Sequence, residues 1–258
     1  MINIDAVKVD KKLITYLAKT YNPLDYSTKL TELISSIYPS VSFNQWEKIK
    51  LHQLVNDLVI HKYNGEQTLK YNLFQTFYKK KLIAAFEIKV NNSRADFLTI
   101  NGHSNSFEIK SSIDNLCKLK RQALDYIKAF EYNYLVIDEK HLIHASELIP
   151  KSFGLWSFKK GRKKVHRDAI LNKKIDAEVQ ISLLTKKELQ LFFSEVGGIK
   201  QQIVRCFNDT EINYRFKSAL KSKYEKRWNF LVKNVDTILP VDIQFFFKTN
   251  VDPSLIYH

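Results

Sequence analysis

The chain has 258 residues, 45% of them hydrophobic and 13% aromatic, so a buried core is expected and a disordered protein is excluded. Its 41 basic and 27 acidic residues give a formal net charge of +14, which favours nucleic acid or an anionic surface as partner, although a lysine-rich solvated surface would give the same excess. Two distant cysteines, Cys117 and Cys206, argue against a structural zinc site. No signal-peptide pattern and no apolar run of about 20 residues occurs, so we expect a cytoplasmic protein with no membrane partner.

The first 64 residues are predicted to form a helical N-terminal region. Between Leu51 and Leu58, apolar residues recur at the spacing of one helix face. Gly65 interrupts this pattern, and Glu66 then begins another helical stretch.

From about residue 82 the apolar spacing changes from helical to strand-like. Three short strands are predicted, followed by a helix and a buried strand, over residues 82–88, 95–100, 106–110, 113–130 and 134–137 respectively. A strand, a helix of about twenty residues and a further strand form the parallel βαβ unit. We therefore expect an α/β core over residues 65–157, of order α-β-β-β-α-β, with a mixed sheet flanked by helices.

Residues 158–258 are predicted to form a basic helical C-terminal region. From residue 151 onward there are 21 basic and 11 acidic residues, which is +10 of the total charge. Thr185 and Glu188 have capping-box spacing, and residues 209–234 have a helical pattern. A basic run opens the region, and its candidate nucleic-acid-binding residues are Lys159, Lys160, Arg162, Lys163, Lys164 and Arg167. Such a run is either a phosphate-binding surface or a solvated charge cluster.

Asp96 and the triplet Glu108-Ile109-Lys110 carry the most informative chemistry. On a strand, Glu108 and Lys110 point to the same face because side chains alternate. If the Asn101-Gly102-His103 segment is a three-residue hairpin loop, Asp96 lies directly opposite Glu108. A two-residue loop would instead place Asp96 on the other face.

Two carboxylates on neighbouring strands repel each other unless a cation lies between them. Hard oxygen ligands of this kind suit Mg²⁺ or Mn²⁺, which together with the Lys110 ammonium could assist water in cleaving a phosphodiester. Glu66 could add a third carboxylate, or could simply favour the first turn of its helix. The competing interpretation is an ordinary ion pair on a solvated strand face. A second triplet of this kind, Glu87 to Lys89, has no aspartate on a preceding strand.

These residues resemble the PD-(D/E)XK nucleases, in particular an uncharacterised bacterial and prophage group of them. The resemblance covers about residues 66–157 and is carried by Glu66, Glu87, Arg94-Ala95-Asp96, Glu108-Ile109-Lys110-Ser111, Asp114, Gln122, Tyr126, Glu139-Lys140-His141 and the Ile149–Leu155 segment. The pattern departs from the family in one letter, because Ala95 stands where proline often precedes the aspartate.

The resemblance implies a restriction-endonuclease-like fold and a role for each matching residue. It implies that Asp96 and Glu108 bind the metal, that Lys110 assists the water, and that the Ile109 carbonyl completes the metal site. Gln122 is implied to lie near the metal-bound phosphate. Glu87 and Arg94 are second-tier candidates, and Arg94 could pair with a phosphate or with Glu87.

We therefore expect a metal-dependent nuclease, with DNA favoured over RNA as its substrate. A non-catalytic nucleic-acid-binding protein on the same fold is the first alternative, and a phage or defence interaction protein is the second. Cleavage of both strands of a duplex would favour a homodimer. Neither sequence preference nor the choice between internal and terminal cleavage follows from the sequence.

Overall fold

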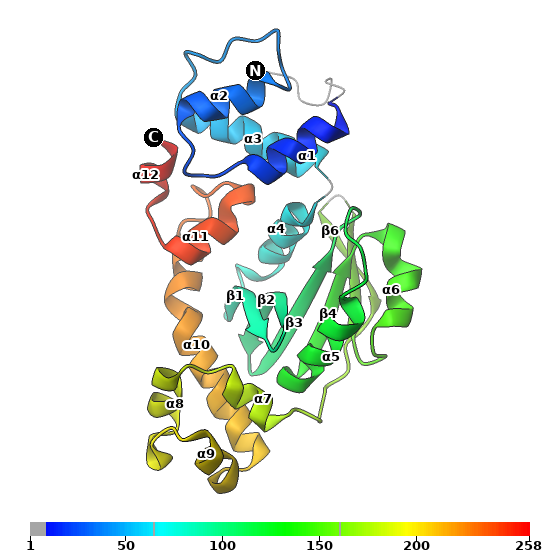
Figure 1. Ribbon diagram of the computed structural model, residues 1–258, viewed down its shortest axis with the longest axis vertical. Helices are drawn as coiled ribbons and strands as arrows, with labels where there is room; N and C mark the ends of the chain where they lie inside the picture. Colours follow the sequence, from blue (N-terminus) through cyan, green and yellow to red (C-terminus); the bar gives the residue numbers. More distant parts are fainter. Residues whose placement is uncertain (1–8, 64, 160) are drawn as a thin grey trace. The chain divides into compact units, whose positions relative to one another are not determined.

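The structure, a computed structural model, contains a six-stranded mixed sheet flanked by helices (Figure 1). The chain is therefore α/β, as predicted. No helix in the part of the chain that the structure describes is both long and apolar enough to cross a membrane. The described residues are 9–63, 65–159 and 161–258.

The chain divides into two compact units, residues 1–73 with 230–258 and residues 74–229. It passes between the units within helix α4 (Glu66–Phe77) and again within helix α10 (Asp209–Lys233). The three-part division expected from the sequence stays a prediction.

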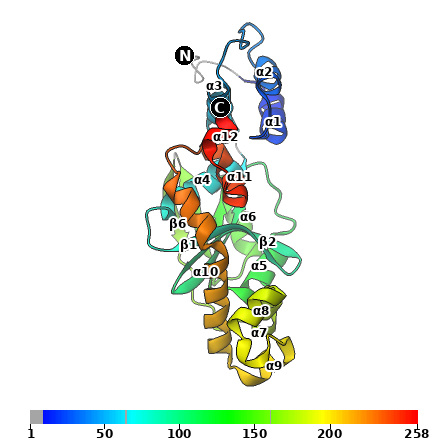
Figure 2. The same cartoon turned by 90° about the vertical axis from the view of Figure 1, so that its left-hand side faces the viewer.

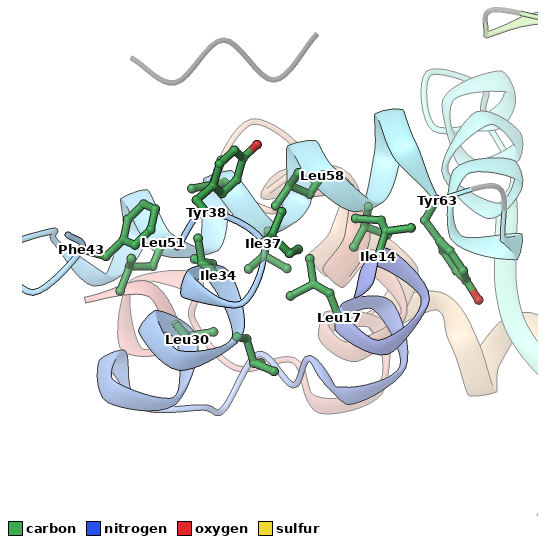
Figure 3. Close-up of a cluster of buried hydrophobic side chains, with 14 residues drawn as sticks. Ile14, Leu17, Leu30, Ile34, Ile37, Tyr38, Phe43, Leu51, Leu58 and Tyr63 are labelled. Carbon is green, nitrogen blue, oxygen red and sulfur yellow. The ribbon is translucent and has the colours of Figure 1, made fainter. Parts of the chain in front are cut away.

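The first unit is helical in its described part, as the sequence predicted for residues up to 64. Apolar side chains from the first three helices point toward one another and form its core, with Leu17, Leu30 and Leu58 almost fully buried (Figure 3). The elements are α1 (Lys11–Thr20), α2 (Ser27–Ser35), α3 (Lys48–Lys62), the 3-10 helix η4 (Pro240–Asp242), α11 (Ile243–Thr249) and α12 (Pro253–Tyr257).

A buried carboxylate lies in this unit. Asp242 is 1% exposed, and its Oδ2 accepts hydrogen bonds from the hydroxyls of Tyr21 at 3.0 Å and Tyr257 at 2.8 Å. The Tyr21 hydroxyl also lies 2.8 Å from Nδ1 of His52. Burial raises the pKa of Asp242 to about 7, and burial lowers the pKa of His52 to about 4. Both groups are thus stabilised in their neutral forms.

The second unit contains the sheet, with its strands in sequence order from one edge to the other. The first three strands are antiparallel, the third to fifth are parallel, and the last two are antiparallel. Helix α5 (Leu119–Ala129) makes the predicted βαβ crossover between two parallel strands. The strands are β1 (Ile83–Val90), β2 (Ser93–Asn101), β3 (His103–Lys110), β4 (Tyr132–Ile137), β5 (Gly154–Lys159) and β6 (Arg162–Arg167).

The helices of this unit cover the sheet and surround one half of α10. Helix α5 lies against the sheet, and α7, α8 and α9 gather beside α10 in both views (Figures 1 and 2). Thr185 and Glu188 form the predicted capping box at the start of α8. The remaining helices are η2 (Glu139–His141), α6 (Leu142–Leu148), α7 (Ala177–Ser182), α8 (Lys186–Phe192), η3 (Ser194–Val196) and α9 (Lys200–Cys206).

The basic segment after residue 157 differs from expectation. Residues 162–167 form a strand, whereas a helical region was predicted from residue 158. Gly161 has φ +73°, and Lys159 pairs with Arg162 across the turn, so β5 and β6 form a tight hairpin. An edge strand rich in exposed lysine is a common device against strand-to-strand aggregation, which explains a strand in so charged a segment.

Candidate active site

The β2–β3 hairpin sets the register that the sequence predicted. Ile100 pairs with Ser104 across the turn, and Gly102 has φ +74°. The paired ladder continues to Phe97 and Phe107, so the next positions along the two strands are Asp96 and Glu108.

Beyond the Phe97–Phe107 pair, the Asp96 side chain, and not a backbone carbonyl, accepts the next hydrogen bond from β3. The Ile109 N–H donates a hydrogen bond to Oδ2 of Asp96 at 2.7 Å. It is therefore the amide of Ile109, not its carbonyl, that the structure connects to Asp96. The metal-binding role expected for the carbonyl stays a prediction.

Glu108 is the centre of a buried polar cluster. Its side chain is surrounded by donors, and the residue is 1% exposed. Oε1 accepts from Lys110 Nζ at 2.6 Å and from Gln122 Nε2 at 2.5 Å, while the Tyr126 hydroxyl lies 2.5 Å from Oε2. Burial raises the pKa of Glu108, although the Lys110 charge and the three hydrogen bonds oppose that rise. Lys110 and Gln122 donate to Oε1 and favour the ionised form of Glu108, while the single hydroxyl hydrogen of Tyr126 is shared between Oε2 and the Arg94 carbonyl.

Lys110 is a half-buried cation in the same cluster. Its side chain is 13% exposed and forms an ion pair with Glu108. Burial alone would lower the pKa of Lys110, but the charges of Glu108, Asp96 and Asp114 outweigh burial, so the pKa is raised. The ammonium therefore keeps its proton, and it can orient water or offset developing negative charge but does not act as a base.

Helix α5 supplies the other two contacts to Glu108. Gln122 and Tyr126 are four residues apart and thus share one face of the helix. The Tyr126 hydroxyl also lies 2.7 Å from the Arg94 carbonyl, so it links α5 to β2 as well as to Glu108. The Gln122 Oε1 atom is buried and has no hydrogen-bond partner among the described residues. Tyr126 belongs to the resemblance but had no role assigned, although its spacing from Gln122 could have suggested one.

Glu87 lies beside Asp96 on the neighbouring strand β1. The pairs on either side of it, Phe86 with Phe97 and Ile88 with Ala95, place Glu87 opposite Asp96 in the register. Its φ of +59° is in the left-handed region, which costs a residue with a side chain on the order of 1–3 kcal/mol. Such strain is concentrated at functional sites, and this supports Glu87 as a candidate residue of the active site.

Arg94 was expected to meet either a phosphate or Glu87. Its guanidinium lies 3.5 Å from Oε2 of Glu87, and its side chain is 61% exposed. Arg94 is therefore paired with Glu87, and its exposed guanidinium is also accessible to a phosphate.

An open pocket of about 530 Å³ lies directly beside the carboxylates. Glu87, Asp96 and Gln122 line it. Its cationic lining residues are Lys89, Arg94, Lys118 and Arg121. Three of these four, Lys89, Lys118 and Arg121, were not predicted. Lys118 precedes the first residue of α5 and Arg121 directly precedes Gln122, and this closeness to Gln122 could have indicated both. A pocket lined by four cationic side chains suits an anionic substrate.

The donor set fits a small hard divalent cation. Asp96 and Glu108 offer carboxylate oxygens, and a carboxylate has about four acceptor positions, of which Glu108 uses three. The buried Gln122 Oε1, which has no hydrogen-bond partner among the described residues, is a further oxygen that could bind the cation or one of its water ligands. Among the described residues no group of three or more His, Cys, Asp or Glu side chains could hold a metal. Two carboxylates with water as the remaining ligands is nevertheless a common arrangement for Mg²⁺.

Glu66, the other predicted metal ligand, belongs to the first compact unit. Its carboxylate lies 3.2 Å from Lys70 Nζ, one helical turn further along α4. Its proposed part in the metal site stays a prediction.

The basic residues predicted to bind nucleic acid point to both faces of the sheet, because successive side chains of strand β6 alternate between the faces. The Lys163 ammonium lies 4.1 Å from the centre of the Trp156 ring, whereas Lys164 lies 3.6 Å from a glutamate of η2 on the opposite face. Arg167 donates to two main-chain carbonyls, at 2.7 and 3.4 Å. Lys160 lies outside the described residues. The run therefore does not form one continuous basic surface.

Comparisons with known proteins connect the chain to phage proteins. A family model described as bacteriophage P4 protein cII matches residues 60–246. Protein cII of Enterobacteria phage P4 is 29% identical over 143 residues, which is 51% of this chain and 54% of that protein, so the match spans about half the length of the relative. A protein of unknown function from Silicibacter pomeroyi is 18% identical and covers 54% of this chain and 89% of its own, with a TM-score of 0.35.

Proposed function

For this chain, which belongs to the bacteriophage P4 protein cII family, we propose a metal-dependent nuclease of the PD-(D/E)XK type, with DNA favoured over RNA, on the basis of the site around Asp96 and Glu108. Its sheet unit would then be a restriction-endonuclease-like core. Asp96 and Glu108 are the proposed metal ligands, and Lys110 is the proposed assistant of the attacking water.

One observation carries the proposal. A buried Glu108 and a half-buried Lys110, joined by an ion pair, lie on the same sheet face as Asp96, and Asp96 lines an open pocket with four cationic residues. A solvated ion pair, the competing interpretation from the sequence, would not be buried to this degree. Burying a charge pair beside an accessible pocket costs desolvation energy, and such costs are typical of reactive sites.

The residues of the chain have distinct parts in the proposed reaction. The pocket cations hold the phosphodiester backbone next to Asp96. The Lys110 ammonium orients a water molecule whose oxygen bonds to phosphorus while the bond to the leaving oxygen breaks. The water loses a proton to solvent and the leaving oxygen gains one, so that one water is added in total. Gln122 and Tyr126 hold the Glu108 carboxylate in place through their hydrogen bonds.

A magnesium or manganese ion, when bound by Asp96 and Glu108, would supply positive charge for the reacting phosphate. Lys110 supplies only one positive charge, which is less than a phosphate with developing negative charge requires. The hard oxygens of the two carboxylates favour these metals over zinc.

One feature favours a second candidate function. Three acceptor positions of Glu108 are already used by donors of the protein itself, as in a structural cluster. A nucleic-acid-binding protein without catalysis could retain such a cluster for stability, and it would still use the cations of the pocket.

A cleavage assay distinguishes the two candidates. Supercoiled plasmid, linear duplex, single strands and RNA are incubated with Mg²⁺, Mn²⁺ or EDTA. The wild type is compared with Asp96→Asn and with Asp236→Asn, which changes an exposed carboxylate outside the site. Metal-dependent cleavage lost only in Asp96→Asn supports the nuclease. Salt-sensitive binding without cleavage in all three proteins would replace it with the binding protein.

A further inference from the structure

Cationic side chains on the Asp96 face of the sheet lie in one row that crosses the strands. Lys89 of β1 is paired with Arg94 of β2, and both also line the pocket beside Asp96. Continued along the two strands, the β2–β3 register places Arg94 opposite Lys110. Because directly opposite side chains of paired strands share a face, these three cations lie on the face that carries Asp96.

The row continues through the parallel strands to the far side of the sheet. Lys110 is paired with Ile137 of β4, and the register of β4 with β5 places Ile137 beside Ser157. Ser157 is in turn paired with Lys164 of β6. The side chains of Ile137 and Ser157 are buried, whereas that of Lys164 is 62% exposed. Lys164 is therefore the cation that follows Lys110 in the row, and it is accessible.

Strand alternation separates the cations of β6. Arg162, two residues before Lys164, lies on the same face, and both side chains are exposed. The Lys163 ammonium instead lies 4.1 Å from the ring centre of Trp156, which alternates with Ser157 along β5 and so lies on the opposite face. Arg162 and Lys164, but not Lys163, thus face the side of the sheet that carries the proposed active site.

The carboxylate paired with Lys164 leaves it available to a ligand. Glu139 of η2 lies 3.6 Å from the Lys164 ammonium, and its own side chain is 43% exposed. An ion pair this exposed is weak, so a phosphate can replace Glu139 at little cost. Lys140, next to Glu139 and exposed, lies 3.3 Å from the Ser112 carbonyl, two residues beyond Lys110. It therefore adds positive charge close to the end of β3.

The length of the row matches a short stretch of nucleic-acid backbone. Neighbouring strands are about 4.8 Å apart, so the three strand spacings from Lys110 to Lys164 span about 14 Å. Successive base pairs of a duplex rise about 3.4 Å, so this distance corresponds to about four base pairs. A row of cations of this length suits a polyanion that extends beyond the pocket.

We propose that duplex DNA crosses this row, with its reacting phosphate at the pocket beside Asp96 and a phosphate about four base pairs away held by Lys164 and Arg162. The inference deepens the proposed function, on which it rests for the substrate and for the position of the reaction. These cations contact the backbone and read no base edge, so the contact does not depend on the DNA sequence.

Binding without cleavage tests the contact. The Asp96→Asn protein in EDTA is titrated with a fluorescent duplex of about 20 base pairs at several salt concentrations. Lys164→Ala and Lys163→Ala are a matched pair, because they remove the same charge from neighbouring residues on opposite faces. We expect Lys164→Ala to reduce the slope of log affinity against log salt concentration by about one, and to weaken binding about five- to tenfold near 0.1 M salt. Lys163→Ala should leave both quantities nearly unchanged.

A third variant should act in the opposite direction. Glu139→Gln removes the carboxylate that competes with phosphate for Lys164, so it should strengthen binding. Circular dichroism checks that each variant is folded. Equal effects of the two lysine variants, or a Glu139→Gln protein that binds no more tightly, would overturn the proposal. Metal-dependent cleavage by the wild type decides the nuclease separately, so a protein that cleaves DNA but shows no difference between the lysine variants loses only this contact.

Discussion

Glu108 in the second compact unit and Asp242 in the first are buried carboxylates with different neighbours. Glu108 is 1% exposed and is paired with the Lys110 ammonium. Asp242 is also 1% exposed, and within the described part of the chain its side chain receives hydrogen bonds only from the neutral hydroxyls of Tyr21 and Tyr257. Burial raises the pKa of both carboxylates, that of Asp242 to about 7, but at Glu108 the positive charge of Lys110 opposes the rise, and Asp242 has no such cation among its hydrogen-bond donors in the described residues.

The surroundings differ in access as well. Asp96, connected to Glu108 through the adjoining strand, lines an open pocket rich in cations. The comparison teaches that burial alone does not identify a reactive carboxylate. A buried carboxylate paired with a cation, next to an open pocket lined by cationic side chains, is the better candidate for a reactive group.

We call Glu108 with Lys110, Gln122 and Tyr126 the charged cluster, and Asp242 with Tyr21, His52 and Tyr257 the neutral cluster. The largest expected effect comes from removing Lys110, the cation that distinguishes the charged cluster from the neutral one. Lys110→Ala should slow single-turnover DNA cleavage by about a thousandfold, because charge stabilisation in the reaction is lost. It should also destabilise the fold by about 3–5 kcal/mol, since Glu108 remains buried without its charged partner.

A double variant separates the two consequences of that change. Glu108→Gln with Lys110→Met replaces the ion pair by neutral groups of similar size, so it should recover most of the stability while remaining inactive. Unfolding in denaturant and cleavage are measured on the same preparations, with the exposed Lys120→Ala as control. Substantial cleavage by the stable double variant would show that the cluster is structural.

The next largest effect is the pH dependence that the neutral cluster gives to the free energy of unfolding. The pKa of Asp242 is raised from 3.8 to about 7, so the folded state binds this proton more tightly, and its contribution to the free energy of unfolding falls as pH rises between those values. The pKa of His52 is lowered from 6.5 to about 4, and its contribution falls in the opposite direction, as pH decreases.

Asp242→Asn isolates the carboxylate from the histidine. The difference in unfolding free energy between the variant and the wild type should change by about 3 kcal/mol between pH 4 and pH 7, in favour of the variant at the higher pH. Denaturant unfolding at several pH values measures it, with Asp236→Asn as control. A difference that is constant with pH would mean that Asp242 is not stabilised in its protonated form.

A smaller effect is expected from the strained backbone next to the charged cluster. Glu87→Gly should raise the free energy of unfolding by about 1 kcal/mol relative to Glu87→Ala, because glycine adopts φ +59° without steric cost. Thermal unfolding of the two variants measures this difference. Equal stability would show that the left-handed conformation at this position is not strained.

The smallest effect is expected from the rim of the pocket. Arg121→Ala should weaken DNA binding and reduce the slope of log affinity against log salt concentration by about one, while the rate at saturating DNA stays nearly constant. A lower rate at saturation with unchanged salt dependence would place Arg121 in the reaction itself.

The Asp96, Glu108 and Lys110 part of the charged cluster could be predicted from the sequence, because these residues lie close together along the chain on either side of one hairpin turn. The Asn101-Gly102 turn fixes the hairpin register, and strand alternation then brings Asp96 and Glu108 to one face, as observed. Gln122 came from a family resemblance, and its four-residue spacing from Tyr126 explains why both reach Glu108.

The neutral cluster could not be predicted in this way. Tyr21, His52, Asp242 and Tyr257 lie far apart along the chain, and no short-range pattern connects them. The strand at 162–167 was missed for another reason: its lysines and arginines hide the alternation of a strand, and only pairing with β5 stabilises it.

Metal binding tests the contrast between the two clusters most directly. Mn²⁺ is titrated calorimetrically into the wild type, Asp96→Asn and Asp242→Asn in the absence of nucleic acid. The account predicts saturable binding by the wild type and by Asp242→Asn, and loss of that binding in Asp96→Asn. Undiminished binding by Asp96→Asn, or no binding by the wild type even when nucleic acid is added, would contradict a metal-dependent active site at Asp96 and Glu108.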